Sequence, residues 1–393
     1  MNILYVGTLP PHPGGSAVSC SLLLAGLARL GHTVRALGPI TPEVLRTGDP
    51  FASGHPEIRT TRFLLPYFET SPDLPAPEEY RRLEGEEIRR TLPALVAEER
   101  PDVLFIGRET FAWHVPDLAG AASLPCLLRV AGSTLLGMMN GSQGRERTEE
   151  LLRKIRRVDV LVAVARHMAA SLEGLGLTNV TTIPNSVDLD QFAPRTGNAS
   201  LRRELAIRDD DIVVMHVSNM KTLKRTLDIV DSAELALPRS SKLAYVIVGD
   251  GPGRAAMEDA CRRKGIHGRF RFVGWMEYPR VPDFISLADI VVMPSEAEAQ
   301  ARVYVETQAS GRVLVASDIP AAREVIADGE TGLLFRKGDA GDLARKTLLA
   351  AGDPGLRLEI GRRARERVQA HSLDTAVAAY AATLGRVVQQ HRR

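Results

Sequence analysis

Two glutamates, Glu298 and Glu306, stand eight positions apart after the apolar run "IVVMP". A carboxylate pair can hold the hydroxyls of a sugar or ribose by accepting charge-assisted hydrogen bonds. It can also be the acid and nucleophile of a glycosidase, or simply two exposed helix residues. The pattern predicts a loop over residues 296–300 and a short helix over residues 301–310, ended by Gly311. We expect Glu298 near the start of this helix and Glu306 within it.

The second chemical signal is a cluster of cations in "HVSNMKTLKRTLDIV", residues 216–230. Lys221, Lys224 and Arg225 precede a predicted helix, where positive charge opposes the helix dipole. A bound anion such as a diphosphate would compensate them, whereas a solvated basic turn is the alternative. Because the cluster follows a predicted strand, we favour anion binding.

Glycine-rich turns follow two other predicted strands. Gly14 and Gly15 precede Ser16 at the start of a predicted helix, so unpaired backbone N–H groups there could face a phosphate. A plain tight turn capped by Ser16 explains this stretch equally well. The turn "VGDGPGR", residues 248–254, has a spacing that identifies no ligand. The first turn is not a GxGxxG, so dinucleotide binding receives little support.

The elements that must position these residues alternate along the chain. Short runs that are apolar on both faces, such as "NILYVG", "DVLFIG", "LAYVIVG" and "DIVVMPS", are separated by amphipathic helical stretches. This predicts an α/β protein with parallel sheets covered on both sides. At 393 residues the chain is too long for one ordinary core. We therefore expect two doubly wound domains, with ligands at the carboxyl ends of the strands.

The turn-rich segment "TTIPNSVDLDQFAP", residues 181–194, separates the two sets of elements. We place the domains at residues 1–187 and 188–372. The proline-rich stretch 67–79 is expected to form a surface excursion, and residues 145–157 a solvated, salt-bridged helix face.

Composition narrows the class of protein. Apolar residues make up 44% and charged residues 25% of the chain, which is typical of a soluble globular protein, and the net charge of +2 indicates no nucleic-acid partner. The three scattered cysteines fit neither a disulfide framework nor a zinc site. The start "MNILYVGT" does not read as a secretion signal, and no apolar run approaches the roughly 18 residues of a spanning helix. We expect a cytoplasmic protein whose only membrane contact would be peripheral.

In order and spacing, a series of segments along nearly the whole chain resembles the retaining glycosyltransferases of family 4. These segments are "GGSAVSCSLLLAGLARLGHTV", "VTTIPNSVDLDQFAP", "HVSNMKTLKR", "VIVGDGPGR", "FRFVGWM", "LADIVVMPSEAEAQARVYVETQASGRVLVASDIPAAREVI" and "DGETGLLF". The resemblance implies the GT-B fold, in which two Rossmann-like domains face a cleft. It also implies that the last helix, within residues 373–393, packs back on the first domain.

In that family the second glutamate, here Glu306, holds the ribose of a sugar nucleotide, and the first, here Glu298, lies close to the transferred sugar. Lys224 matches the lysine that binds the diphosphate, and Lys221, Lys224 and Glu298 are the expected catalytic residues. The full expected donor site comprises Gly14, Gly15, Asn219, Lys221, Lys224, Arg225, Gly249, Val273, Gly274, Glu298, Gln300, Ala301, Arg302 and Glu306.

The chain departs from the family pattern at three places. Ala-Gln-Ala at residues 299–301 replaces the usual Gly-Phe-Gly, and Asn219 replaces an arginine. With Lys221, the "SN..K..KR" arrangement is similar to that of the N-acetylglucosaminyl-malate synthase group of the bacillithiol pathway. Ala131 stands where an active-site histidine is expected. Four polar residues are acceptor-side candidates: Arg108, Glu109, His114 and Arg129. For His114, a structural role is favoured over a catalytic one.

The resemblance implies transfer of a sugar, with retention, from a nucleotide-diphosphate sugar to an acceptor hydroxyl, without metal or cofactor. UDP-N-acetylhexosamine is the preferred donor and GDP-mannose the alternative; the acceptor is a small molecule or carrier-linked. A sugar-nucleotide hydrolase or a GT-B-type epimerase would use the same donor pocket. A dinucleotide-dependent oxidoreductase and a non-catalytic sugar-nucleotide-binding protein are further alternatives. The oligomeric state is not predicted.

Overall fold

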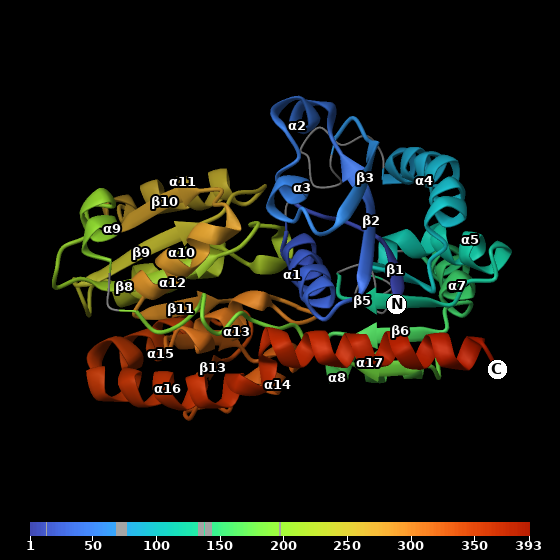
Figure 1. The fold of residues 1–393 in the computed structure, drawn as a ribbon. Helices are drawn as coiled ribbons and strands as arrows, with labels where there is room; N and C mark the ends of the chain where they lie inside the picture. Colours follow the sequence, from blue (N-terminus) through green and yellow to red (C-terminus); the bar gives the residue numbers. More distant parts are fainter. Residues whose placement is uncertain (13, 68–76, 133–136, 138–143, 196–197) are drawn as a thin grey trace. The chain divides into compact units, whose positions relative to one another are not determined.

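The computed structural model describes residues 1–12, 14–67, 77–132, 137, 144–195 and 198–393. The chain divides into two compact units, one formed by residues 1–185 with 373–393 and the other by residues 186–372. Each unit is a layered α/β structure (Figure 1). The predicted surface excursion falls largely on residues 68–76, which lie outside the described residues.

Unit 1 is built on a parallel sheet that has seven strands within the described residues, in the order β3-β2-β1-β4-β5-β6-β7. The central strands are buried along nearly their whole length, because helices cover both faces. The strands are β1 (Asn2–Val6), β2 (Thr33–Ile40), β3 (Arg59–Leu64), β4 (Val103–Ile106), β5 (Cys126–Val130), β6 (Val160–Ala163) and β7 (Val180–Thr182).

The helices of unit 1 include the last helix of the chain. In one apolar cluster, Leu23 and Leu27 of the first helix lie together with Tyr380 and Leu384 of the last helix. Residues of strands β1 and β4 belong to the same cluster. The α-helices are α1 (Gly15–Arg29), α2 (Pro42–Thr47), α3 (Pro50–Gly54), α4 (Pro77–Glu99), α5 (Val115–Ala121), α7 (Arg145–Ile155), α8 (Arg166–Gly174) and α17 (Leu373–His391), with the 3₁₀ helix η1 (Glu109–Trp113). Ion pairs such as Arg145 with Glu149 line α7, which confirms the predicted salt-bridged face.

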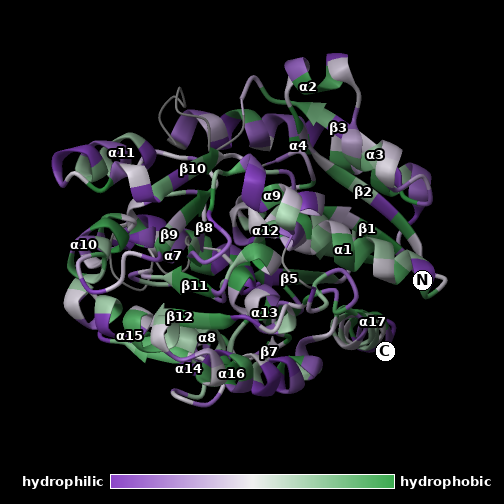
Figure 2. Ribbon diagram, turned by 90° about the vertical axis from the view of Figure 1, so that its left-hand side faces the viewer, coloured by the Kyte–Doolittle hydropathy of each residue, from purple (hydrophilic) through white to green (hydrophobic). Residues whose placement is uncertain are grey.

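Unit 2 is built on a second parallel sheet, with six strands within the described residues in the order β10-β9-β8-β11-β12-β13. The strands are β8 (Ile212–Val217), β9 (Leu243–Val248), β10 (Phe270–Gly274), β11 (Ile290–Met293), β12 (Val313–Ser317) and β13 (Leu333–Phe335). In Figure 2 strands β11 and β12 are predominantly green, that is, apolar. The predicted α/β class with two parallel sheets is therefore confirmed.

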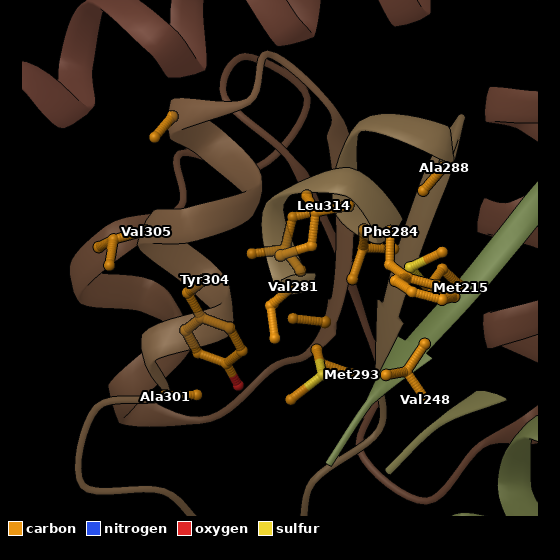
Figure 3. Packing of buried hydrophobic residues seen from close by; sticks show 14 of the residues in the cluster. Met215, Val248, Val281, Phe284, Ala288, Met293, Ala301, Tyr304, Val305 and Leu314 are labelled. Atoms are coloured by element: carbon orange, nitrogen blue, oxygen red, sulfur yellow. The ribbon is translucent and has the colours of Figure 1, made fainter. Parts of the chain in front are cut away.

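Helices cover both faces of the unit 2 sheet. On each face a separate apolar cluster lies between the sheet and its helices. Figure 3 shows one of them, in which Val281 and Phe284 of one helix and Tyr304 of another pack towards Met215 and Met293 of the strands. The α-helices are α9 (Ala199–Glu204), α10 (Leu227–Ala236), α11 (Arg254–Arg263), α12 (Val281–Leu287), α13 (Arg302–Ala309), α14 (Pro320–Val325), α15 (Ala340–Gly352) and α16 (Pro354–Arg367), with the 3₁₀ helices η2 (Thr222–Lys224), η3 (His267–Arg269), η4 (Tyr278–Arg280) and η5 (Val368–His371).

The strand order of each sheet reverses at one point. In unit 2 the chain runs outwards from β8 through β9 to β10, and then from β11 through β12 to β13 on the other side. Loops that leave the carboxyl ends of β8 and β11 therefore diverge, and this is where ligands of such sheets bind. The loop with the three cations follows β8, and the loop with Glu298 follows β11.

Two further properties of the described residues concern their helices and their cysteines. None of their helices combines the length and apolar character that crossing a membrane requires. Cys20, Cys126 and Cys261 are buried free thiols.

The contact between α16 and the end of α13 gives a test of the packing. A Cβ added at Gly361 of α16 would lie 2.1 Å from the backbone oxygen of Gly311, in the turn between α13 and β12. We expect Gly361→Ala to lower the free energy of unfolding of unit 2 by about 1–3 kcal/mol. Gly352→Ala at the end of α15 is the control, because a Cβ there meets no atom within 4 Å. Urea unfolding of both variants tests this, and equal stability of Gly361→Ala and wild type would contradict the packing.

Candidate functional site

The loop after β8, residues 218–226, is held in a strained conformation. Met220 and Arg225 have positive φ angles of 45° and 47°, a region that residues other than glycine seldom adopt. Between them lies the short helix η2, which carries Lys224. Such strain persists only where surrounding contacts enforce it, and it concentrates at functional sites.

The glycine turn after β9 is one of the contacts that enforce this conformation. A Cβ at Gly249 or Gly251 would lie 1.9 Å from the backbone oxygen of Ser218 or Asn219, respectively. The N–H of Gly253 donates to the backbone oxygen of Met220 at 3.0 Å. The glycines of "VGDGPGR" therefore let the backbone of the β8 loop pack directly against this turn.

His216, inside β8, holds the same loop through contacts of its two ring nitrogens. Its Nδ1 lies 2.8 Å from the carbonyl oxygen of Val292 in β11, and its Nε2 lies 2.7 Å from Oγ of Ser218. Since a carbonyl only accepts, Nδ1 carries the proton and Nε2 accepts from the hydroxyl of Ser218. Oγ of Ser218 in turn accepts from the N–H of Met220 at 3.0 Å. Burial, and then the charge of Lys224, lowers the pKa of His216 to about 4, so the ring is neutral at neutral pH.

An ion pair joins the β8 loop to the β11 loop. Nζ of Lys224 lies 2.5 Å from Oε1 of Glu298, and the two side chains are 19% and 10% exposed. Oγ of Ser295 donates to the same oxygen at 2.7 Å. The structure thus brings together two of the three predicted catalytic residues, 74 positions apart in the sequence.

A second set of contacts joins the same two loops. The N–H of Glu296 donates to the backbone oxygen of Leu223 at 2.8 Å. The carboxylate of Glu296 pairs with Arg225 at 3.2 Å and with Lys337 at 2.7 Å. Lys337 and then Arg225 lower the pKa of Glu296. Carboxylates of the protein therefore already compensate part of the positive charge for which the sequence predicts an anion.

Glu306 lies within α13, as predicted, whereas Glu298 lies in the preceding loop, four positions before the first helical residue. Both Nε and Nη2 of Arg302 contact Oε1 of Glu306, at 3.1 and 3.0 Å. The side chains of Arg302 and Glu306 are 7% and 3% exposed. Nη2 of Arg302 also donates to Oη of Tyr278 at 2.5 Å.

The remaining donor-site candidates of unit 2 lie around these loops. Gln300 and Ala301 are buried in the loop before α13. Gly274 ends β10 after Val273, and its carbonyl oxygen accepts from the N–H of Gly249 at 2.7 Å. Oδ1 of Asn219 is buried and accepts no hydrogen bond from the described residues. A buried acceptor of this kind marks a position where a ligand can donate.

In unit 1, residues at the carboxyl ends of β4, β5 and β7 contact one another or the start of α1. The fully buried Arg129 donates to Oδ1 of Asn185 at 2.6 Å and to Oγ of Ser16 at 3.3 Å, in the first turn of α1 after Gly14. The buried carboxylate of Glu109 accepts from the N–H groups of Ala131 and Gly132 at 3.3 and 3.2 Å. Its Oε1 has no partner among the described residues.

The other two acceptor-side candidates differ in their surroundings. Arg108 directly precedes Glu109 and is partly exposed. His114 lies against Gly85 of α4, where an added Cβ would be 2.4 Å from its ring. Its burial, followed by the charges of Arg89 and Lys154, lowers the pKa of His114 to about 4. These neighbours lie on helices α4 and α7 rather than in the loops after β1, β4 and β5. Such surroundings favour a structural role for His114.

No group of three or more His, Cys, Asp or Glu residues gathers in a metal-binding arrangement within the part of the chain that is described. Two acidic stretches, residues 188–190 and 209–211, have other partners. Asp211 pairs with Arg208 and Arg269, and Oδ1 of Asp188 accepts from the N–H groups of Asp190 and Gln191. They therefore stabilise turns.

A depression beside β13 is an alternative location for a ligand. It is lined by charged residues that are already paired, with Arg323 on Asp318, Lys346 on Asp328 and Arg345 on Asp342. These charges compensate one another, and the depression lies beside β13 rather than at the carboxyl ends of β8 and β11, where the strand order reverses.

Sequence reasoning did not identify four residues that support the site. His216 and Glu296 lie inside the quoted segments "HVSNMKTLKRTLDIV" and "SEAEAQ", but their partners come from β11 and from Lys337. Tyr278 and Lys337 lie outside the segments that signalled chemistry. The sequence offers one signal for such residues, a charged or imidazole group within an otherwise apolar strand. Of the four, His216 shows it.

Comparison with known proteins matches two family models to the chain. Residues 13–191 match the model described as Glycosyltransferase Family 4, and residues 198–367 match the model described as Glycosyl transferases group 1. Together the two models span both units.

Three similar proteins illustrate the match. The chain is 31% identical over 228 residues to D-inositol 3-phosphate glycosyltransferase of Kribbella flavida, covering 54% of this chain and 53% of the relative. It is 28% identical over 217 residues to N-acetyl-alpha-D-glucosaminyl L-malate synthase of Bacillus anthracis, covering 54% and 56%. The chain thus spans about half the length of these curated relatives. The structure of Anabaena HepE in complex with UDP-glucose matches with a TM-score of 0.79 at 18% identity, over 98% of this chain and 100% of that one.

The buried His216 generates a pH prediction. Its pKa in the folded state, about 4, lies below its ordinary value of 6.5. As the pH falls from 6.5 towards 4, the unfolded chain therefore binds a proton that the folded chain does not, and stability falls. From pH 7 to pH 5 we expect His216 to account for a loss of about 2 kcal/mol in the free energy of unfolding.

Urea unfolding at both pH values, in wild type and in His216→Leu, measures this loss. The wild type should lose about 2 kcal/mol more than the variant on acidification. An equal loss in both proteins, or an NMR titration of the His216 ring with a midpoint above pH 6, would show that the ring is not held neutral.

Proposed function

The chain belongs to the family-4 glycosyltransferases, and on this premise we propose that it transfers a sugar from a nucleotide-diphosphate sugar to an acceptor hydroxyl with retention at the anomeric carbon. The observation that carries the proposal is the ion pair of Lys224 and Glu298 at the switch point of unit 2. It places a cation and a carboxylate at the carboxyl ends of β8 and β11, where a donor would bring a diphosphate and a sugar.

The largest chemical demand of such a transfer is the charge that develops on the departing diphosphate. Preorganised cations stabilise it at little cost in reorganisation. An ammonium group has three N–H donors, so Lys224 can keep its bond to Glu298 while it donates to phosphate oxygens. The exposed Lys221 stands at the start of η2 and supplies a second charge. The strained backbone of Met220 and Arg225 fixes the position of both lysines.

Glu298 and Glu306 would divide the remainder of the donor between them. Glu298, held by Lys224 and Ser295, faces the transferred sugar, and Glu306 accepts from the ribose hydroxyls. Asn219, whose Oδ1 has no partner among the described residues, and the backbone around Gln300 and Ala301 would complete the contacts. Val273 and Gly274 would meet the base. In the transfer, the bond between the anomeric carbon and the diphosphate oxygen breaks, and the oxygen of the acceptor hydroxyl bonds to the same face of that carbon. The departing diphosphate keeps its oxygen and assists removal of the acceptor proton.

UDP-N-acetylhexosamine is the donor that we favour. The Lys221 arrangement resembles that of the N-acetylglucosaminyl-malate synthase group. The name of the Bacillus anthracis relative specifies an N-acetylglucosaminyl product, and HepE was solved with UDP-glucose. On the acceptor side, Glu109 of η1 and Arg129 of β5 in unit 1 are the candidate contacts. The three free thiols suit a reducing cytoplasm.

A thermal-shift panel with UDP, GDP and ADP tests the donor site. A nucleotide at about 100 times its dissociation constant stabilises the fold by roughly 2.7 kcal/mol, which moves the Tm visibly. We expect UDP to raise the Tm of wild type, and the shift to be reduced in Lys224→Ala and Glu306→Ala. Lys242→Ala is the matched control, because this lysine pairs with Asp210 before the amino end of β9. Absence of a shift with every diphosphate, or equal shifts in all variants, would refute the donor site.

Turnover separates transfer from hydrolysis. Lys224→Ala is expected to lower kcat by on the order of 10²-fold, since it removes a donor to the developing charge. The assay follows UDP release from UDP-N-acetylglucosamine with and without pooled hydroxyl acceptors. Release that is independent of any acceptor would favour a hydrolase using the same pocket.

A further inference from the structure

The guanidinium of Arg302 grips one oxygen of Glu306. The two residues are four positions apart on α13, so their side chains lie on the same face of the helix. Nε and Nη2 of Arg302 both contact Oε1 of Glu306, at 3.1 and 3.0 Å. Because both contacts end on Oε1, they fix one oxygen of the carboxylate and thereby set the direction of the other, Oε2.

Tyr278 holds the guanidinium in this position. Its Oη accepts from Nη2 of Arg302 at 2.5 Å, and Cζ of Arg302 lies 5.0 Å from the centre of its ring. The ring of Tyr278 is in turn packed against that of Phe192, with centroids 5.9 Å apart. Arg302 is therefore bound on one side by a charge and on the other by a hydroxyl and an aromatic face.

The energetics of burial argue against a purely stabilising role for this pair. Moving both charges out of water costs free energy that offsets much of their attraction. Apolar residues of similar size in their place often give a protein of equal stability. In α13 the neighbouring positions Val303 and Val305 are apolar, so this helix packs without further ion pairs at those positions. A buried carboxylate is costly without a partner, so Glu306 depends on Arg302 for its orientation.

We propose that Arg302 and Tyr278 are positioning residues, which hold Oε1 of Glu306 so that Oε2 meets the ribose hydroxyls of the donor. This inference rests on the proposed function, because it assigns the donor nucleotide to Glu306. Arg302 acts through Glu306, because Nε and Nη2 of its guanidinium are engaged by Glu306 and Tyr278.

Discrimination between ribose and deoxyribose measures the position of Glu306 directly. Titration calorimetry with UDP and with 2′-deoxy-UDP gives the ratio of their dissociation constants. A hydrogen bond to a charged group predicts a ratio of about 10 or more in wild type. Glu306→Ala should bring the ratio close to one, and Arg302→Met and Tyr278→Phe should each lower it several-fold. Arg302→Lys should recover only part of it, since an ammonium cannot form the two-pronged contact.

A partly buried arginine elsewhere in unit 2 provides the control. Nη2 of Arg312 donates to the backbone oxygens of Arg195 and Ser286, so Arg312→Met should lower the Tm and leave the ratio unchanged. Tyr278→Phe keeps the aromatic ring and removes one oxygen, which preserves the test if Arg302→Met does not fold.

The outcomes separate the two proposals. If Glu306→Ala loses the preference for ribose while Arg302→Met and Tyr278→Phe keep the wild-type ratio, the positioning role is overturned and the proposed function stands. If wild type binds neither nucleotide, the proposed function fails and the positioning role fails with it.

Discussion

The attraction between Lys224 and Glu298 is the interaction on which the donor-side arrangement depends. It joins two loops that leave neighbouring parallel strands and then diverge to opposite sides of the unit 2 sheet. A crevice at such a switch point follows from the strand order alone. The ion pair, together with the contacts of Glu296 to Leu223 and Arg225, determines which chemical groups line it.

Holding these charges in place requires contacts that store strain and bury polar atoms. Met220 and Arg225 adopt left-handed backbone conformations, and His216 is buried as a neutral ring between two strands. Each of these features lowers stability by itself. The glycines at 249 and 251 offset part of this cost, since only a residue without a Cβ allows the β8 loop to pack so closely. Packing of the apolar sheets offsets the stability that is lost at the site. This is typical of proteins whose functional sites depart from local conformational preferences.

The sequence predicted the parallel sheets because the strands are buried on both faces and therefore form continuous apolar runs. It also predicted a helix over 301–310, observed as Arg302–Ala309, with Glu306 inside it, and placed the cations in the loop after a strand. It did not predict that Glu298 pairs with Lys224, because the two lie 74 positions apart and meet only through the strand order. For the same reason Tyr278, 24 positions before Arg302, gave no sign of its contact. Spacing within one helix can place Arg302 beside Glu306, but it cannot say which oxygen is held.

The central claim is that the loops after β8 and β11 together bind a nucleoside diphosphate. Hydrogen–deuterium exchange with and without saturating UDP measures this most directly, because it locates binding along the chain. The account predicts slower exchange of backbone amides in residues 218–226 and 294–306 on addition of UDP. Protection confined to other segments, with both loops unchanged while UDP is bound, would contradict it.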